Sequence, residues 1–253
     1  MEASGHVVTD SESVMGAPAS LPAAQARALE NHLGGADAAN YRRYEYDLIA
    51  AHCGRRVLEV GAGLGEFSAQ FTSLEHLTVT DTDPLCLSAL RQRFAGRLDV
   101  AVVPMDLDGA LELAEPVDTV LAMNVLEHIE DDVAALRGLA GLLARGGNVV
   151  LWVPAYPALY GDFDRLVGHY RRYTPAMVRA VAQAAELTVD VVRPVNLLGG
   201  LAWWAAVRLA KQGNASPRLV RIYDRTVVPT TRWLEQRWTP PFGQSLLCVL
   251  RPR

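Results

Sequence analysis

A glycine-rich segment is the part of the chain that most clearly predicts chemistry. The sequence VLEVGAGLGEF, residues 57–67, runs from an apolar stretch directly into Gly61, Gly63 and Gly65. Glycine lets the backbone turn sharply and lets a ligand approach the amide groups, and a following helix start offers N–H donors. Asp81 ends the next apolar run, about twenty residues after Gly61, where a carboxylate accepts hydrogen bonds from both hydroxyls of a ribose. This spacing predicts a nucleoside-binding site.

Two histidines are candidates for moving a proton. His128 follows Glu127, and His169 lies in the later sequence YGDFDRLVGHYRRYTP, residues 160–175. Histidine titrates near neutrality, so either side chain could take a proton from a hydroxyl or an amine. Two alternatives stay open: Glu127 and His128 could simply begin a helix, or the two histidines could bind a transition metal ion. The nearby Asn124 is a weaker ligand than a carboxylate, and we predict no metal.

The segment 160–175 also gathers acidic, basic and aromatic side chains in a loop expected over the site. Arginine binds carboxylate or phosphate through paired hydrogen bonds, and tyrosine stacks or forms a hydrogen bond. With the loop after Pro154 and a tryptophan-rich stretch further on, these side chains could form an acceptor pocket. The predicted substrate-binding residues are Tyr156, Tyr170, Arg171, Arg172 and Trp204. In an alternative interpretation, Asp162, Asp164 and the arginines hold the loop to the core.

Short β-branched apolar runs alternate with longer helical stretches from Arg56 onward. The runs are RVLEV, HLTVT, LDVAVV, DTVLAM and NVVLWVP, with LTVDVV and SLLCVL later in the chain. Such alternation predicts a doubly wound α/β fold, in which a parallel sheet has helices on both faces. Thr174 followed by Pro175 predicts the start of a helix that continues to Glu186. Ligands of such sheets bind outside the carboxyl ends of the strands, which would bring the glycine segment and His128 together.

Taken together, the motifs resemble those of class I S-adenosylmethionine-dependent methyltransferases. Glu59 precedes the glycine turn, and Glu66 stands where a nicotinamide-binding motif needs a third glycine. Asp106 and Leu107 follow the third predicted strand, where this family holds adenine, and residues 118–132 resemble its fourth strand and the following loop. The resemblance implies S-adenosyl-L-methionine as cofactor. It implies the cofactor-binding residues Glu59, Gly61, Ala62, Gly63, Gly65, Asp81, Asp106, Leu107 and Asn124.

The resemblance also implies an architecture. We expect a Rossmann-like, mostly parallel sheet of seven strands whose last strand, SLLCVL, is antiparallel. A flexible leader over 1–21 would precede a single methyltransferase domain over 22–253, which begins with a helical arm over 22–54. A helical insertion over 195–243 would cover the site, since it is too long for an ordinary connection. The GHYRRY sequence at 168–173 resembles a bacterial, small-molecule subgroup of the family.

Composition narrows the function further. The chain has 253 residues and a formal net charge of -4, and an acidic balance argues against a nucleic acid partner. Its three cysteines are far apart and predict neither a disulfide framework nor a zinc site. We see no secretory signal, and the longest apolar stretch, residues 197–207, is too short to span a bilayer. We therefore predict a cytoplasmic protein that is a monomer or homodimer.

The predicted activity is methyl transfer to a small-molecule acceptor. The acceptor would be a specialised metabolite or a lipid-like compound, methylated on oxygen in preference to nitrogen or carbon, with His128 and His169 as catalytic residues. One alternative is methylation of a macromolecule, which is weakened because no Asn/Asp-Pro-Pro-Tyr motif is present. Another is a protein that binds S-adenosylmethionine on the same scaffold without transferring a methyl group, because a fold does not fix function.

Overall fold

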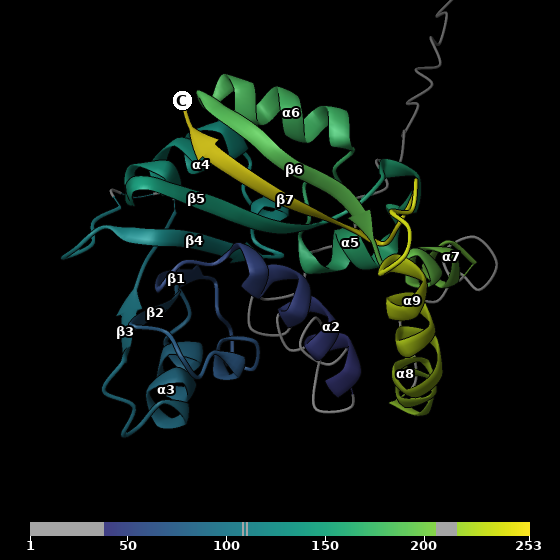
Figure 1. The fold of residues 1–253 in the computed structure, drawn as a ribbon, viewed down its shortest axis with the longest axis horizontal. Coiled ribbons are helices and arrows are strands. Elements are labelled where there is room, and N and C mark those ends of the chain that lie inside the picture. Colours follow the sequence, from purple (N-terminus) through teal and green to yellow (C-terminus); the bar gives the residue numbers. More distant parts are fainter. Residues whose placement is uncertain (1–37, 108, 110, 206–216) are drawn as a thin grey trace, which may run out of the picture.

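The computed structural model describes residues 38–107, 109, 111–205 and 217–253. Seven strands form one sheet in the order β3-β2-β1-β4-β5-β7-β6 (Figure 1). The strands are β1 (Arg56–Val60), β2 (His76–Asp81), β3 (Val100–Pro104), β4 (Val117–Met123), β5 (Leu143–Pro154), β6 (Leu187–Val195) and β7 (Ser245–Pro252). Strands β1 to β5 pair in parallel, and β7 runs antiparallel between β5 and β6. The predicted fold class, with its antiparallel last strand, is confirmed.

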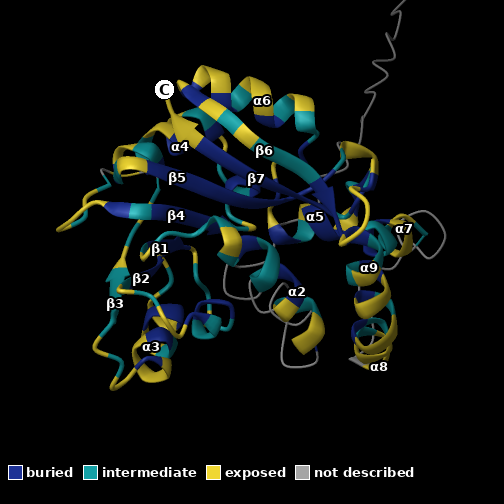
Figure 2. Ribbon diagram, in the orientation of Figure 1, coloured by how far each residue is buried: buried dark blue, intermediate teal, exposed yellow. Residues whose placement is uncertain are grey.

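Helices cover both faces of the sheet (Figure 1). They are α2 (Ala39–Ile49), α3 (Pro84–Arg93), α4 (Asp132–Gly141), α5 (Asp162–Val167), α6 (Pro175–Ala184), α7 (Leu197–Ala205), α8 (Pro217–Ile222) and α9 (Val228–Glu235). Side chains alternate along a strand, so Leu58 and Val60 of β1 join the core under α4 and α6, whereas Val57 joins the core under α2 and α3. Figure 2 shows the resulting band of buried strands between exposed outer helix surfaces.

The boundaries of the predicted elements follow local chemistry. Helix α6 begins at Pro175, and the Thr174 hydroxyl accepts a hydrogen bond from the backbone N–H of Met177, as expected for an N-cap. Strand β5 begins at Leu143, earlier than the sequence pattern predicts, because Leu143 already pairs with Val117 of β4 before a register shift. Pairing with a neighbour therefore extends this strand beyond its apolar run.

The helical arm before β1 is fixed by residues from the other end of the chain. The carboxylate of Asp224 accepts hydrogen bonds from the backbone N–H groups of Asn40 and Tyr41, at 3.1 and 2.8 Å, and so caps the start of α2. Further along α2, the Tyr44 hydroxyl bonds to the carboxylate of Glu235 in α9. The arm and the insertion before β7 therefore form one packed unit beside the sheet.

The predicted insertion is helical in its described parts. Helix α7 follows β6, and α8 continues through a π-helical turn, Tyr223–Val227, into α9. Residues 206–216, between α7 and α8, lie outside the described part of the chain. The indole N–H of Trp203 donates to the carbonyl of Leu159 at 3.1 Å, so α7 is held against the segment after β5.

The structure does not test several predictions about the leader, the location and the assembly of the protein. No helix in the described residues is both long enough and apolar enough to cross a membrane. No disulfide bond joins the three cysteines, all of which lie in the described part of the chain. The leader over 1–21 lies outside the described residues, and the domain limits, the cytoplasmic location and the oligomeric state stay predictions.

Candidate functional site

The glycine-rich turn lies at the carboxyl end of β1 and has a backbone that only glycine adopts easily. Gly61, Gly63 and Gly65 have φ angles of 65°, 56° and 71°, in the left-handed region. A Cβ atom on Gly61 would lie 2.7 Å from a methyl group of Val125, and one on Gly65 would lie 2.7 Å from a methyl group of Leu90. The close approach of Val125 and Leu90 to the turn therefore requires glycine at both positions.

Asp81 connects the glycine turn to the neighbouring strand. It is the last residue of β2 and is only 1% exposed. One carboxylate oxygen accepts the N–H of Gly63 at 2.9 Å and the other accepts the N–H of Asp83 at 2.9 Å. The backbone N–H of Ala62 also donates to the carbonyl of Thr80, at 2.8 Å. These bonds hold a carboxylate beside the turn, the arrangement that the sequence predicts for ribose binding.

Glu59 lies inside β1, two residues before the turn, and is buried. Burial raises the pKa of its carboxyl group to about 7, although the hydrogen bond from the Ser68 hydroxyl, at 2.5 Å, acts in the opposite direction. A carboxyl group with such a pKa gains a proton readily and gives it up when a cation approaches. Ser68 was not predicted as a site residue, because a serine nine positions along the chain carries no distinguishing signal.

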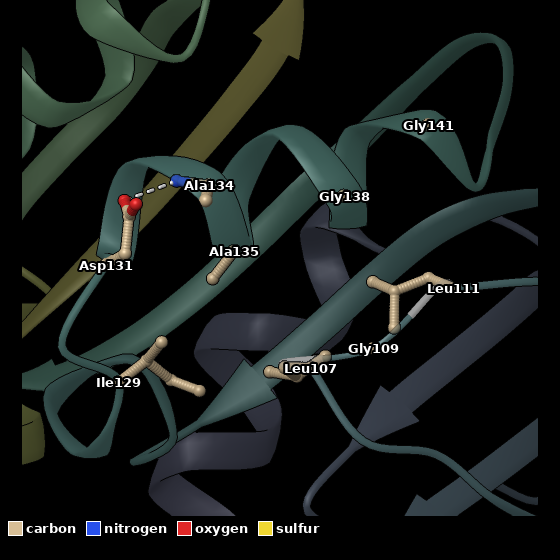
Figure 3. Close-up of a pocket in the computed structure, with 9 residues that line it drawn as sticks. All are labelled: Leu107, Gly109, Leu111, Ile129, Asp131, Ala134, Ala135, Gly138 and Gly141. Carbon is tan, nitrogen blue, oxygen red and sulfur yellow. Dashed lines mark hydrogen bonds between the residues drawn. The ribbon is translucent and has the colours of Figure 1, made fainter.

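A pocket adjoins the residues predicted to hold adenine. It has a volume of about 550 Å³ and lies between the segment after β3 and helix α4 (Figure 3). Its lining residues are Leu107, Gly109, Leu111, Ile129, Asp131, Ala134, Ala135, Gly138 and Gly141. Asp106 is exposed at its edge, immediately before Leu107. An apolar wall next to an exposed carboxylate suits a flat base that carries an amino group.

Asn124 is the first residue after β4, as Gly61 is the first residue after β1. Its φ angle is 50°, unusual for a residue other than glycine, and its backbone N–H donates to the carbonyl of Trp152 at 2.8 Å. Its side chain is exposed. The residues predicted to bind the cofactor thus lie at the carboxyl ends of four adjacent parallel strands, β1 to β4, and both the backbone shape and the buried carboxylates fit a nucleoside cofactor.

The two histidines, far apart in sequence, are neighbours in space. Their ring centroids lie 4.7 Å apart with the rings nearly perpendicular. Nε2 of His169 lies 4.0 Å from a carboxylate oxygen of Glu127. Glu127, His128 and His169 each offer one possible ligand atom, and these three atoms lie within 4.8 Å of one another. Such a set could hold a transition metal ion. The expectation that no metal binds stays a prediction.

Asp164 fixes the orientation of His169. The side chain of Asp164 is fully buried, and one of its oxygens lies 2.8 Å from Nδ1 of His169 and 2.7 Å from Nε of Arg172. Burial alone would raise the pKa of Asp164, but the hydrogen bond from His169 and the charge of Arg172 outweigh it, so the pKa lies below its ordinary value. An ionised carboxylate only accepts hydrogen bonds, so Nδ1 of His169 carries the proton and Nε2 faces Glu127.

The arginines of the GHYRRY segment are held by the protein. The side chain of Arg172 is 4% exposed and is engaged by Asp164, which is at odds with its predicted contact to substrate. Arg171 pairs with the carboxylate of Asp132 at 2.7 Å and donates to the carbonyl of Glu130. Tyr170 is 55% exposed. The alternative interpretation, in which charged residues hold this loop to the core, describes Arg172 because a buried guanidinium needs a carboxylate partner.

The two remaining predicted substrate residues lie on different elements. Tyr156 follows β5; its ring stacks on that of Phe242, 4.8 Å away, and its hydroxyl donates to the carbonyl of Pro241. Trp204 is on α7 and is 47% exposed, whereas its neighbour Trp203 packs edge-on against Phe163 of α5. The structure therefore joins Tyr156 to the segment before β7 and places Trp204 on the outer side of the insertion.

Comparisons with known proteins agree with this geometry. Residues 58–149, from β1 to β5, match the model of a methyltransferase domain. A stretch of 115 residues is 36% identical to the tRNA U34 carboxymethyltransferase of Methylococcus capsulatus, and the alignment covers 44% of this chain and 35% of that protein. The chain thus spans about a third of the length of this relative.

Solved structures share the fold at low sequence identity. The S-adenosylmethionine-dependent methyltransferase from Mesorhizobium loti superposes with a TM-score of 0.57 and 16% identity, covering 87% of this chain and 99% of that chain. The glycopeptide N-methyltransferase MtfA complexed with S-adenosylmethionine superposes with a TM-score of 0.54 and 16% identity, covering 87% and 88%. The domain match over residues 58–149 and the shared fold agree with the predicted class of S-adenosylmethionine-dependent methyltransferases.

The predicted acceptor needs a correction. We expected a small-molecule acceptor and no nucleic acid partner, but several relatives that match part of the chain are named tRNA U34 carboxymethyltransferases, so the expectation is wrong. The argument from charge fails because the net charge of -4 is a sum over the whole chain. Phosphates contact a local surface, and the charge of that surface decides binding.

Proposed function

We propose that this protein is an S-adenosylmethionine-dependent methyltransferase whose acceptor is a nucleic acid, in particular a tRNA. The observation that carries the cofactor part is the glycine turn of β1, shaped by three left-handed glycines and tied to the buried carboxylate of Asp81. The acceptor part is supported by the relatives named for modification of tRNA. Because the alignments cover only part of those proteins, the acceptor is inferred from likeness to them.

In this proposal each cofactor residue has a defined task. Asp81 accepts the ribose hydroxyls, the glycine turn lies against the methionine portion, and Asp106 with Leu107 holds the adenine next to the pocket of Figure 3. Glu59, close behind the turn, offsets the charge of the cofactor's amino group. When bound, the cofactor supplies a methyl group already activated by its sulfonium. The protein's contribution is to align the acceptor and to exclude water.

The histidine pair has the geometry of a proton acceptor. Asp164 holds a proton on Nδ1 of His169, Nε2 of the same ring faces Glu127, and the His128 ring lies 4.7 Å from the His169 ring. We propose that His128, which is only partly buried, takes the proton that an acceptor oxygen or nitrogen loses on methylation. His169 and Asp164 would hold the His128 ring in place.

The loop around the GHYRRY sequence would form the acceptor side of the site. Tyr170 is exposed and its ring lies 5.7 Å from the guanidinium of Arg171, a pair suited to stacking against a base. Tyr156, which follows β5, would also contribute to the acceptor side. Arg172 would keep the loop in place through Asp164 and would not touch the acceptor.

A transfer assay tests the function directly. The purified protein is incubated with S-adenosylmethionine labelled on its methyl group and with a pool of bacterial tRNA, duplex DNA or total protein. We expect label in tRNA alone, no label with Asp81→Ala, and normal labelling with Asp190→Ala, a change at an exposed aspartate on β6. Binding of S-adenosylmethionine without label in any tRNA would refute the proposed acceptor.

A further inference from the structure

The outer surface of helices α8 and α9 carries an unusual concentration of exposed positive charge. Arg218, Arg221, Arg225 and Arg237 are all exposed, in a chain whose net charge is -4. We propose that this surface, called here the arginine face, binds the phosphate backbone of the RNA acceptor. The inference rests on the proposed function and adds to it a docking surface separate from the catalytic residues.

The acidic residues of the same segment are turned inward. Asp224 and Glu235 are the only acids in residues 217–238, and both are buried. Asp224 caps α2, while Glu235 accepts the N–H of Leu197 at 2.8 Å and bonds to Tyr44. Both negative charges are therefore used to attach the helices to the rest of the fold, and residues 217–238 present no exposed acidic side chain.

The spacing of the arginines suits a polyanion. Arg218 and Arg221 are three residues apart and Arg225 lies four further on, so successive side chains are separated by about one helical turn, or about 5 Å along the axis. Arg232 pairs with Asp47 of α2 and helps to seat the helix instead. A row of guanidinium groups releases counterions when it meets phosphates, which gives affinity without base specificity.

Aromatic side chains extend the arginine face toward the end of α9. Trp233 and Trp238 are 55% and 54% exposed. The guanidinium of Arg237 lies 4.3 Å from the ring of Trp233, a cation–π contact that holds both side chains at the surface. Exposed tryptophans beside arginines stack on unpaired bases, a combination typical of surfaces that bind single-stranded nucleic acid.

The same features argue against a lipid surface as the partner. A helix that lies in a membrane interface needs a continuous apolar face. Here the exposed apolar residues form two separate groups, Leu219 with Ile222 and the tryptophans near the end of α9. Exposed Thr226 and Thr230 lie between these groups. Because the arginine face is charged and has no continuous apolar strip, it favours RNA over a lipid surface as its partner.

The position of the arginine face agrees with its proposed role. Helix α9 packs against α7 and α2, and α7 is attached through Trp203 to the segment after β5. In Figure 1 the α8–α9 unit extends from the side of the sheet where β6 ends, the side on which the parallel strands end and the site lies. Figure 2 shows its outward surface as exposed. An RNA bound there would extend from the arginine face toward the site.

Salt-dependent binding of tRNA tests the inference. The triple variant Arg218→Gln/Arg221→Gln/Arg225→Gln is compared with the wild type for its Kd toward a pool of bacterial tRNA. We expect the Kd to rise about tenfold and the slope of log Kd against log salt to fall by about two, because about three phosphate contacts are lost. The Kd for S-adenosylmethionine should not change.

A matched control removes the same charge from the opposite edge of the sheet. Arg55→Gln/Arg145→Gln/Arg253→Gln alters three exposed arginines that lie at the amino ends of β1 and β5 and after the end of β7. This variant should bind tRNA as the wild type does. A second variant, Trp233→Ala/Trp238→Ala, should weaken tRNA binding by about 30-fold without changing the salt slope, because two base stacks are lost and stacking involves no counterion release.

The possible outcomes separate the two proposals. If the wild type methylates tRNA and the triple variant binds it with unchanged Kd and slope, the arginine face is not the docking surface, and the proposed function stands. If the wild type neither binds nor methylates tRNA, both proposals fail. If the triple variant loses binding to vesicles containing phosphatidylserine but keeps its affinity for tRNA, the face belongs to a lipid surface and the inference is overturned.

Discussion

The cofactor half of this protein, at the ends of β1 to β4, and the acceptor half, formed by the histidine pair, the 160–175 loop and the insertion before β7, are built in different ways. Residues of the cofactor half lie at the ends of β1 to β4, and each is placed by the strand or turn that contains it, as Gly61 and Asp81 illustrate. The acceptor half brings together segments far apart in the chain, such as Glu127 and His169. Local backbone geometry therefore defines the cofactor site, whereas tertiary contacts define the acceptor site.

The buried carboxylates of the two halves also have different partners. Acidic groups of the cofactor half lie at the site itself, where buried Glu59 accepts the Ser68 hydroxyl and buried Asp81 accepts backbone N–H groups. In the acceptor half, Asp164 is buried with Arg172, and Asp224 is buried as a helix cap. The first kind of carboxylate lies at the proposed cofactor site, and the second kind holds the structure together. Removing one of each should therefore have different consequences.

The largest effect is expected from removing the ribose carboxylate. Asp81→Ala should raise the Kd for S-adenosylmethionine on the order of 1,000-fold, because two hydrogen bonds to a charged group are lost, each worth about 2 kcal/mol. Isothermal titration calorimetry measures this change. Asp83→Ala, which removes the N-cap of α3 two residues away, should lower stability and leave the Kd unchanged. Equal affinities of Asp81→Ala and wild type would remove the basis for the cofactor assignment.

Removing the structural carboxylate should act on stability instead. Asp164→Ala should lower the free energy of unfolding by about 3 kcal/mol, because Arg172 is left buried without its partner, and should not change the Kd for S-adenosylmethionine. Urea denaturation measures the loss. Asp162→Ala is the control, since this side chain is 87% exposed and should change stability by less than about 0.5 kcal/mol.

The pKa of Asp164 gives this prediction a pH dependence. Because the pKa is lower in the folded protein than in the unfolded chain, the carboxylate contributes stability at neutral pH, and this contribution is lost as the pH falls through its folded pKa. Wild type and Asp164→Ala should therefore become more similar in stability at acidic pH. A constant difference between them from neutral to acidic pH would contradict the ion-pair explanation.

A smaller effect is expected at the proposed proton acceptor. His128→Ala should lower kcat about 100-fold and leave the Kd for S-adenosylmethionine unchanged, because the side chain acts on the acceptor. Single-turnover methylation of tRNA measures the step. His52→Ala, at the amino end of β1, should behave as the wild type. An unchanged kcat for His128→Ala would make this histidine a structural residue.

The smallest effect concerns Glu59 and pH. Its pKa of about 7 means that the carboxyl is mostly protonated at pH 6 and mostly ionised at pH 8, so affinity for the cationic cofactor should rise about tenfold between these values. Protein stability should change in the opposite direction: the unfolded chain loses this proton near pH 4.5, so the free energy of unfolding falls as the pH rises from there to about 7. In Glu59→Gln, neither the affinity for the cofactor nor the free energy of unfolding should show this pH dependence. If the affinity of the variant still rises with pH, another group is responsible for the rise.

Much of the fold follows from local sequence. Apolar runs that alternate with helical stretches predict the first six strands, the resemblance to class I methyltransferases implies the antiparallel seventh, and Thr174 with Pro175 predicts the start of α6. Periodicity and capping are properties of a few neighbouring residues. The start of β5 at Leu143 was missed, since it depends on pairing with Val117. The glycine turn and Asp81 were found because their geometry also depends on nearby residues.

The acceptor side shows where the sequence stopped being informative. Arg171 and Arg172 are adjacent, yet one pairs at the surface with Asp132 and the other is buried on Asp164, a difference that no local pattern encodes. The whole-chain charge predicted no nucleic acid partner, but the fold buries Asp224 and Glu235 and leaves the nearby arginines exposed. The sequence by itself determined the sheet and the cofactor turn, because short-range backbone preferences encode them. Only the tertiary structure decided which charges reach solvent, because burial depends on residues brought together from distant parts of the chain.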